Sequence, residues 1–216
     1  MIAKTLFFGD AGASLQLVQL TGGDEEGFLA SEFDQICHVS GRTDLGLTAV
    51  LVSDWNQDLS PWAAPAVFGD EGFGSGAGQT LQSVLTDIVP KIRETAGEEA
   101  ALYLGGYSLA GLFSLWAGTQ TDVFSGIAAV SPSVWFPGFT DHLKEYPMKV
   151  RSVYLSLGTK EEKTRNPVMR TVGDAIRLTK EILTAAGLKT ELEWNPGNHF
   201  KEPDLRTAKG FAWLLR

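Results

Sequence analysis

The sequence predicts an α/β fold in which a mostly parallel sheet is covered by helices on both faces. Short apolar segments alternate along the 216 residues with longer segments whose apolar positions have helical spacing. Most of the short segments are apolar without interruption, which is typical of strands that are buried on both faces of a sheet. Hydrophobic residues make up 44% of the chain and charged residues 20%, as in ordinary globular domains. We therefore expect residues 1–216 to form a single domain of this class.

Most of the expected strands are short apolar runs bounded by glycine or polar residues, and the last one alternates apolar and polar residues. Residues 4–8 and 14–20 open the chain, either as a hairpin or as a pair of short strands. Further strands are expected over residues 47–52, 100–104, 126–130, 153–157 and 189–194. In a sheet of this kind the functional residues lie in loops beyond the carboxyl ends of the strands.

The expected helices alternate with these strands. They cover residues 25–39, 79–94, 109–117, 168–186 and 204–215. Pro90 is expected to kink or break the second of them, and Gly187 to end the fourth. A long loop over residues 54–78, rich in proline, glycine and aromatic residues, separates the strand at 47–52 from the next helix.

Charge and composition exclude several classes of protein. The net charge of −8 argues against nucleic acid or an anionic membrane as the main partner. The sequence has no apolar run of about 20 residues and no signal-peptide layout at its start, so we expect neither a membrane span nor secretion. Cys37 is the one cysteine, so no internal disulfide can form, and a reducing, cytoplasmic location is expected. Its amphipathic surroundings predict a packed helix residue rather than a nucleophile.

The most informative local pattern is G-x-S-x-A at Gly106, Ser108 and Ala110. It stands between the strand at 100–104 and the helix at 109–117, which is the arrangement of a nucleophile elbow. The backbone of such a turn is strained and leaves no room for bulky side chains two positions either side of the serine. The turn presents the serine hydroxyl at the edge of the sheet and directs the N–H of Leu109 at whatever that hydroxyl attacks. The alternative is a serine that simply caps the helix.

A nucleophilic serine in this position needs an acid and then a histidine later in the chain. Of the three histidines, His38 precedes the serine and His142 lies in a short polar segment. His199 follows the last expected strand and precedes the last helix, so it is the predicted general base. A histidine on a surface loop is the alternative.

The predicted acid is Glu161, which comes first after the strand at 153–157. Glu162 is the second candidate and Asp174 the third. The charged run over residues 160–165 is equally typical of a solvated surface. The other alternative is a serine–histidine pair whose histidine is only loosely held by an acid.

The remaining predicted site residues lie in or beside the strand-end loops. Because the loop after the strand at 47–52 contributes the second oxyanion donor in this arrangement, the N–H of Trp55 or Asn56 is expected beside that of Leu109. The aromatic side chains expected to line a pocket for an apolar acyl group are Tyr107, Trp135, Phe200, Trp62, Trp55 and Phe73, with packing in the core or a lid as the alternative. The glycine-rich segment 72–78 lacks the ending of a nucleotide motif, and no ligand spacing for a metal occurs, so no cofactor and no metal are expected.

These motifs resemble the putative-esterase family of α/β hydrolases, which includes siderophore (enterochelin-type) esterases, feruloyl esterases and S-formylglutathione hydrolase. The similarity covers about residues 100–200 and rests on residues 106–116, on Ser-Pro-Ser-Val-Trp-Phe at 131–136, and on the segments 158–161 and 197–199. The resemblance implies the α/β-hydrolase fold and hydrolysis of a small-molecule ester without a metal. It assigns the nucleophile to Ser108, the base to His199 and the acid to Glu161. Ala110 departs from the glycine of many members, and the short chain leaves little room for a lid.

Three hypotheses follow. The first is a serine esterase that forms an acyl-enzyme, the second a thioesterase or acyltransferase on the same fold, and the third a non-catalytic binding protein that kept the fold. Neither the natural substrate nor the oligomeric state follows from the sequence.

Overall fold

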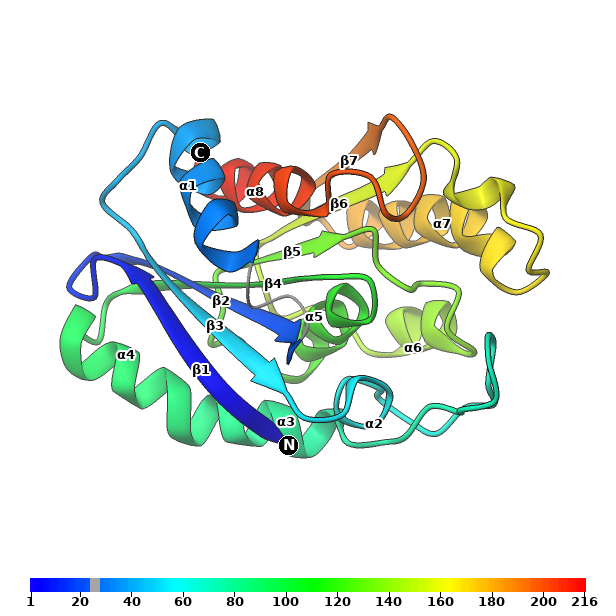
Figure 1. Ribbon diagram of the computed structural model, residues 1–216, viewed down its shortest axis with the longest axis horizontal. Helices are drawn as coiled ribbons and strands as arrows, with labels where there is room; N and C mark the ends of the chain where they lie inside the picture. The colour runs from blue at the N-terminus through cyan, green and yellow to red at the C-terminus, as the bar shows by residue number, and fades with distance from the viewer. Residues whose placement is uncertain (24–27) are drawn as a thin grey trace.

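The computed structural model describes residues 1–23 and 28–216, and over these residues a seven-stranded sheet forms the middle layer (Figure 1). The strands are β1 (Ile2–Gly9), β2 (Leu15–Gly22), β3 (Gly46–Val52), β4 (Ala101–Tyr107), β5 (Gly126–Val130), β6 (Ser152–Gly158) and β7 (Lys189–Asn195). Their order in the sheet is β1-β3-β2-β4-β5-β6-β7. Only β1 runs antiparallel to its neighbour, and every other pair is parallel. The predicted α/β class with a mostly parallel sheet is therefore confirmed.

Helices cover both faces of the sheet, as expected. They are α1 (Leu29–Ser40), α2 (Trp55–Asp58), α3 (Ala77–Ser83), α4 (Val89–Ala96), α5 (Leu109–Gln120), α6 (Phe139–Glu145), α7 (Val172–Ala185) and α8 (Pro203–Leu214). On one face α1 and α8 lie side by side and bury a cluster that includes Ile36, Leu47 and Phe211 (Figure 1). The larger cluster, on the other face, joins α3, α4, α5 and α7 to the sheet.

The first two strands do not form a hairpin, because β3 lies between β1 and β2. Burial explains this order. The six inner residues of β2 are all buried, so this strand needs a neighbour on each side, whereas most residues of β1 are exposed, as befits an edge strand. The alternative of two separate strands is the correct one.

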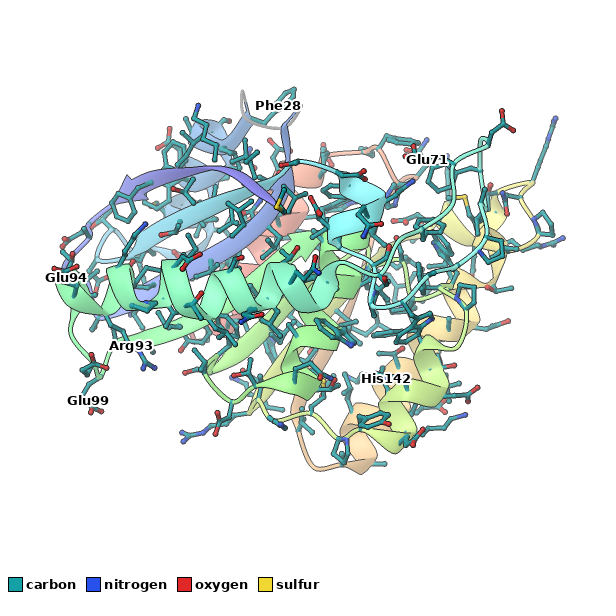
Figure 2. All side chains as sticks on the ribbon, turned by 90° about the horizontal axis from the view of Figure 1, so that it is seen from below. Phe28, Glu71, Arg93, Glu94, Glu99 and His142 are labelled. Carbon is teal, nitrogen blue, oxygen red and sulfur yellow. The ribbon has the colours of Figure 1, made fainter. Side chains whose placement is uncertain are left out.

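Pro90 does not break the helix in which it lies. The helix runs from α3 through a π-helical turn, Val84–Ile88, into α4, where Pro90 occupies the first turn. A proline has no N–H to donate, and a widened turn before it is a known way to accommodate that loss. Val89 and Ile92 face the core, while Glu94 and Glu99 near the end of α4 point away from the sheet (Figure 2).

Other element boundaries differ by a few residues from the prediction. The predicted start of α1 at residues 25–27 lies outside the described residues, and the helix is described from Leu29. A 3-10 turn, Met169–Thr171, precedes α7. The helix ends two residues before Gly187, whose backbone has φ +83°. Helices α2 and α6 were not predicted, since each is a turn or two long and lacks a clear apolar period.

The parallel strands bring three distant segments to one edge of the sheet. Because β4, β6 and β7 run in the same direction, the residues that follow Tyr107, Gly158 and Asn195 emerge at the same edge of the sheet. Over the part of the chain that the structure describes, none of the helices has both the length and the apolar character to cross a bilayer.

Candidate active site

Ser108 occupies a strained turn between β4 and α5. Its backbone has φ +59° and ψ −118°, a conformation that a residue with a side chain rarely adopts. The turn is held by backbone bonds: the N–H of Ser108 donates to the carbonyl of Val130 at 3.0 Å, and the N–H of Ser133 donates to the carbonyl of Ser108 at 3.0 Å. A Cβ on Gly106 would lie 2.6 Å from the Cβ of Ala110, so the turn requires small residues at these two positions.

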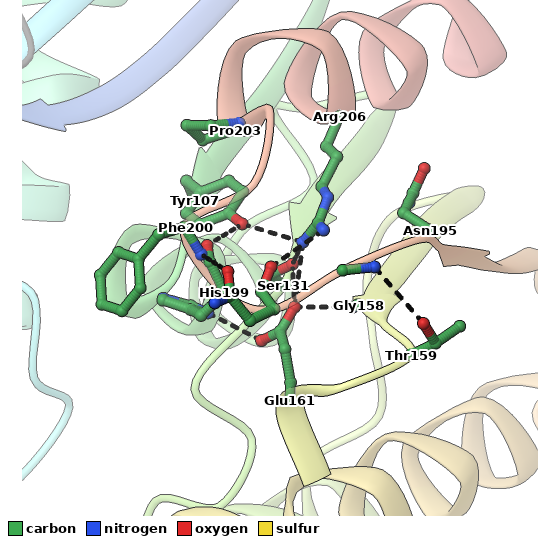
Figure 3. Close-up of polar contacts among 12 residues, drawn as sticks. Tyr107, Ser131, Gly158, Thr159, Glu161, Asn195, His199, Phe200, Pro203 and Arg206 are labelled. Atoms are coloured by element: carbon green, nitrogen blue, oxygen red, sulfur yellow. Dashed lines mark hydrogen bonds and ion pairs between the residues drawn. The ribbon is translucent and has the colours of Figure 1, made fainter. Parts of the chain in front are cut away.

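The structure brings Ser108, His199 and Glu161 together in one hydrogen-bonded chain. Nε2 of His199 lies 3.1 Å from Oγ of Ser108. On the other side of the ring, Nδ1 of His199 lies 2.7 Å from Oε2 of Glu161 (Figure 3). The three residues come from the ends of β4, β7 and β6 respectively. In this order a serine proton can pass to the imidazole while the carboxylate stabilises the charged ring.

The second oxygen of Glu161 is held by three donors. Oε1 accepts from the Ser131 hydroxyl at 2.8 Å, the Gly158 N–H at 2.6 Å and Nη1 of Arg206 at 3.1 Å. The Glu161 side chain is 5% exposed, so these bonds replace the water that a carboxylate would otherwise bind.

The other candidate residues for the base and the acid lie elsewhere. Glu162 and Asp174 both pair with Arg177, at 3.0 Å and 3.1 Å. His142 lies on α6 (Figure 2), where it stacks on Tyr146 with a centroid separation of 4.6 Å, and burial lowers its pKa. His38 is in the last turn of α1.

The residues that carry the three predicted backbone donors line the same cavity as Ser108. Leu109 is the first residue of α5, and Trp55 and Asn56 are the first two of α2. The N–H groups at the start of a helix have no acceptor within that helix. These N–H groups therefore lie at helix starts beside the cavity, and their role as oxyanion donors stays a prediction.

A cavity of about 580 Å³ opens beside Ser108. Its apolar lining consists mainly of Trp55, Phe68, Phe73, Trp135, Met169 and Phe200. The ammonium-bearing side chains of Lys160 and Lys163 also reach it. The size and lining suit an apolar or aromatic group of a small molecule.

Two of the aromatic residues predicted for this pocket take other places. Trp62 donates its indole N–H to the carbonyl of Pro137 at 2.9 Å and packs edge-on against Phe136. Tyr107 donates its hydroxyl to the carbonyl of His199 at 2.6 Å and lines a neighbouring hollow of about 400 Å³. Burial raises the pKa of Tyr107, so the hydroxyl keeps the proton that it donates.

The lone cysteine, Cys37, lies in α1 and does not line the cavity beside Ser108. Cys37 packs in α1 beside the smaller core cluster, and burial raises the pKa of its thiol. Among residues 1–23 and 28–216 there is no group of three or more His, Cys, Asp or Glu side chains that could hold a metal ion.

Sequence reasoning missed Arg206, whose guanidinium is buried behind Glu161. An arginine in a helix rich in apolar residues is the one signal that could have drawn attention to it.

Comparison with solved structures identifies the fold. No protein-family model and no curated protein matches the sequence significantly. An IroE-like serine hydrolase from Shewanella oneidensis superposes with a TM-score of 0.79 at 16% identity, covering 97% of this chain and 74% of that one. The siderophore hydrolase EstA from Aspergillus nidulans gives 0.74 at 17% identity, covering 95% and 83%. The enterobactin esterase FES from Shigella flexneri gives 0.67 at 16% identity, covering 98% of this chain and 54% of that one. These comparisons confirm the α/β-hydrolase fold. They also confirm the resemblance to the putative-esterase family at the level of the fold.

Proposed function

We propose that this protein is a serine hydrolase that cleaves a carboxylic ester of a small molecule through an acyl-enzyme intermediate. The observation that carries the proposal is the chain from Ser108 Oγ to His199 Nε2 at 3.1 Å and from His199 Nδ1 to Glu161 at 2.7 Å. The strained turn at Ser108 supports it, because backbone strain persists where function requires it. The neighbours that share the fold, named as hydrolases and esterases, support ester hydrolysis as the reaction class.

In the first half of the proposed reaction, Oγ of Ser108 attacks the ester carbonyl while its proton passes to Nε2 of His199. The carbonyl oxygen becomes an oxyanion, which accepts from the N–H of Leu109 and from that of Trp55 or Asn56. The tetrahedral intermediate then collapses. The bond to the alcohol oxygen breaks, His199 returns the proton to that oxygen, and the acyl group stays on Ser108.

In the second half, water takes the place of the alcohol. His199 removes a proton from the water, whose oxygen attacks the acyl carbonyl, and the same donors hold the second oxyanion. Collapse returns the proton to Oγ of Ser108 and releases the carboxylic acid. Throughout, Glu161 holds the imidazole with Nδ1–H toward its carboxylate and stabilises the imidazolium.

The cavity suggests which part of the substrate the protein binds. Its apolar walls, with Trp135 and Phe200 among them, fit an aromatic or other apolar acyl group. A panel of esters and thioesters with matched acyl groups separates the esterase from a thioesterase, because both reactions use the same residues.

Labelling with a fluorophosphonate tests the proposal directly, because this probe reacts only with an activated serine. We expect mass spectrometry to locate the label on Ser108, with no label in Ser108→Ala and sharply slower labelling in His199→Asn. His142→Asn is the matched control, since it changes a half-buried histidine on α6 and should label like the wild type. A folded wild-type protein that takes no label would refute the proposal and favour a binding protein with a hydrolase fold.

A further inference from the structure

Arg206 is the most completely buried charged residue near the site. It lies in the first turn of α8 with 2% of its surface exposed. Burying a guanidinium costs free energy unless the group is paired and its N–H groups find acceptors. The acceptors around the guanidinium therefore indicate which role this buried charge has.

One nitrogen of the guanidinium faces the carboxylate side of the site. Nη1 lies 3.1 Å from Oε1 of Glu161, 3.3 Å from the Ser131 hydroxyl and 3.2 Å from the Tyr107 hydroxyl (Figure 3). Oε1 is the oxygen that does not contact His199. The ion pair thus holds Glu161 by one oxygen and leaves the other oxygen to the imidazole.

The other nitrogen faces the loop that carries the histidine. Nη2 donates to the carbonyls of Pro196 at 3.1 Å and Asn198 at 3.0 Å. The Tyr107 hydroxyl, itself a neighbour of Nη1, donates to the carbonyl of His199 at 2.6 Å. The loop after β7 is therefore held at three of its carbonyls, directly or through Tyr107, by a single side chain.

We infer that Arg206 is a positioning residue for the Glu161–His199 pair, an inference that rests on the proposed hydrolase function. It joins the end of β4, the end of β5 and the loops after β6 and β7 to α8, so the spacing between acid and base depends on one rigid group. It also places a positive charge against the buried carboxylate, on the oxygen that does not contact the imidazole.

An arginine fits this task better than a lysine. The guanidinium presents donors in a planar fork, so one edge can meet Glu161 while the other meets two carbonyls. A lysine at this position would keep the charge beside the carboxylate but has no second nitrogen that could donate to the carbonyls of the loop.

Two substitutions separate these contributions. Arg206→Lys should keep the charge and lose the hold on the loop, with kcat about tenfold lower and KM little changed. Arg206→Met should lose both, with kcat about 100-fold lower. Arg177→Met is the matched control, because Arg177 forms two ion pairs with carboxylates outside the site and should leave kcat unchanged.

The split between kcat and KM gives a readout that a merely structural role would not move. Arg206 does not line the cavity beside Ser108, so a loss of positioning should lower kcat and leave KM nearly unchanged. A variant that is only less stable should instead lose kcat in proportion to its unfolded fraction, which a thermal melt measures.

Fluorophosphonate labelling of Ser108, run with thermal unfolding on the same samples, distinguishes the possible failures. Wild type that takes no label would refute the proposed function itself. The inference alone would be overturned if the wild type labels and the folded variants Arg206→Lys and Arg206→Met label at the same rate, with unchanged kcat. Should Arg206→Met fail to fold, Arg206→Lys decides, and a wild-type kcat in that variant would refute the positioning role.

Discussion

Replacing Glu161 by glutamine should nearly abolish turnover while leaving the shape of the site unchanged. The amide has one oxygen and one NH₂ group where the carboxylate has two oxygens. Three donors converge on the Oε1 position, from Ser131, Gly158 and Arg206, at 2.6–3.1 Å. Turning the NH₂ group toward them would forfeit three hydrogen bonds, at about 1 kcal/mol each. The amide oxygen should therefore take the Oε1 position in nearly all molecules.

That orientation points the NH₂ group at Nδ1 of His199, which must then accept a hydrogen bond instead of donating one. The ring proton moves to Nε2, the atom that faces Oγ of Ser108, so the ring can no longer take the serine proton. A change of tautomer of this kind costs about 10⁴ in kcat. Four factors of ten at about 1.36 kcal/mol each correspond to about 5.4 kcal/mol of transition-state stabilisation.

The substitution should also lower stability, since Arg206 loses its anionic partner at a site where both side chains are at most 5% exposed. Removing one member of a buried pair costs about 3–5 kcal/mol. The assay is steady-state hydrolysis of a chromogenic aryl ester by Glu161→Gln, with thermal unfolding on the same sample.

Glu162→Gln provides the matched control, because the neighbouring carboxylate pairs with Arg177 outside the site. It should keep the wild-type kcat. A folded Glu161→Gln protein with more than about a tenth of the wild-type kcat would refute the reasoning, since the tautomer argument allows only about 10⁻⁴.

Three further predictions follow from single contacts. Gly106→Ala should lower the free energy of unfolding by about 1–3 kcal/mol, because its Cβ would lie 2.6–2.8 Å from atoms of Ala110, whereas Gly78→Ala meets nothing within 4 Å and should be harmless in a thermal melt. Trp135→Ala should reduce kcat/KM about tenfold for an aromatic acyl ester, and less for an acetyl ester, through lost apolar contact in the cavity. Burial lowers the pKa of His142 in the folded protein. Below about pH 6.5 the unfolded chain therefore binds more protons than the folded one, and the free energy of unfolding falls as pH falls. His142→Gln should make this fall smaller in denaturant titrations between pH 7 and 5. Equal pH dependence in both proteins would contradict the last of these.

Much of the fold could be predicted because its signals are local. The pattern of apolar residues placed β3, β5, β6 and β7 to within one residue at each end, and glycine spacing marked the turn at Ser108. The proximity of His199 to Ser108 followed from chain order and parallel strands, and needed no contact information. The sheet order of β1 and β2 was open, because burial of β2 on both sides depends on the finished sheet.

The sequence favoured Glu161 over Glu162 only by its position after β6, and held no signal for the contacts that separate the two carboxylates. Glu161 and Glu162 are adjacent in a 3-10 turn, so their side chains point in different directions, and the spacing past β6 differs by one residue. What decides between them is Gly158, Ser131 and Arg206, which meet Glu161 from three other segments. These contacts exist only in the tertiary structure, and no pattern in the sequence predicts them.

The two oxygens of Glu161 have different partners, which has an electrostatic consequence. A carboxylate that contacted only His199 would exert its full negative charge on the ring, but at 5% exposure its other oxygen would be buried without a donor. Arg206 on that oxygen compensates for the burial, although its charge also weakens the attraction that the imidazolium feels. The fold thus gains a carboxylate whose position is fixed, and the ring gains less electrostatic stabilisation from it. This arrangement is consistent with the bonds that hold the His199 loop from the same guanidinium, since a fixed acid is useful only beside a fixed base.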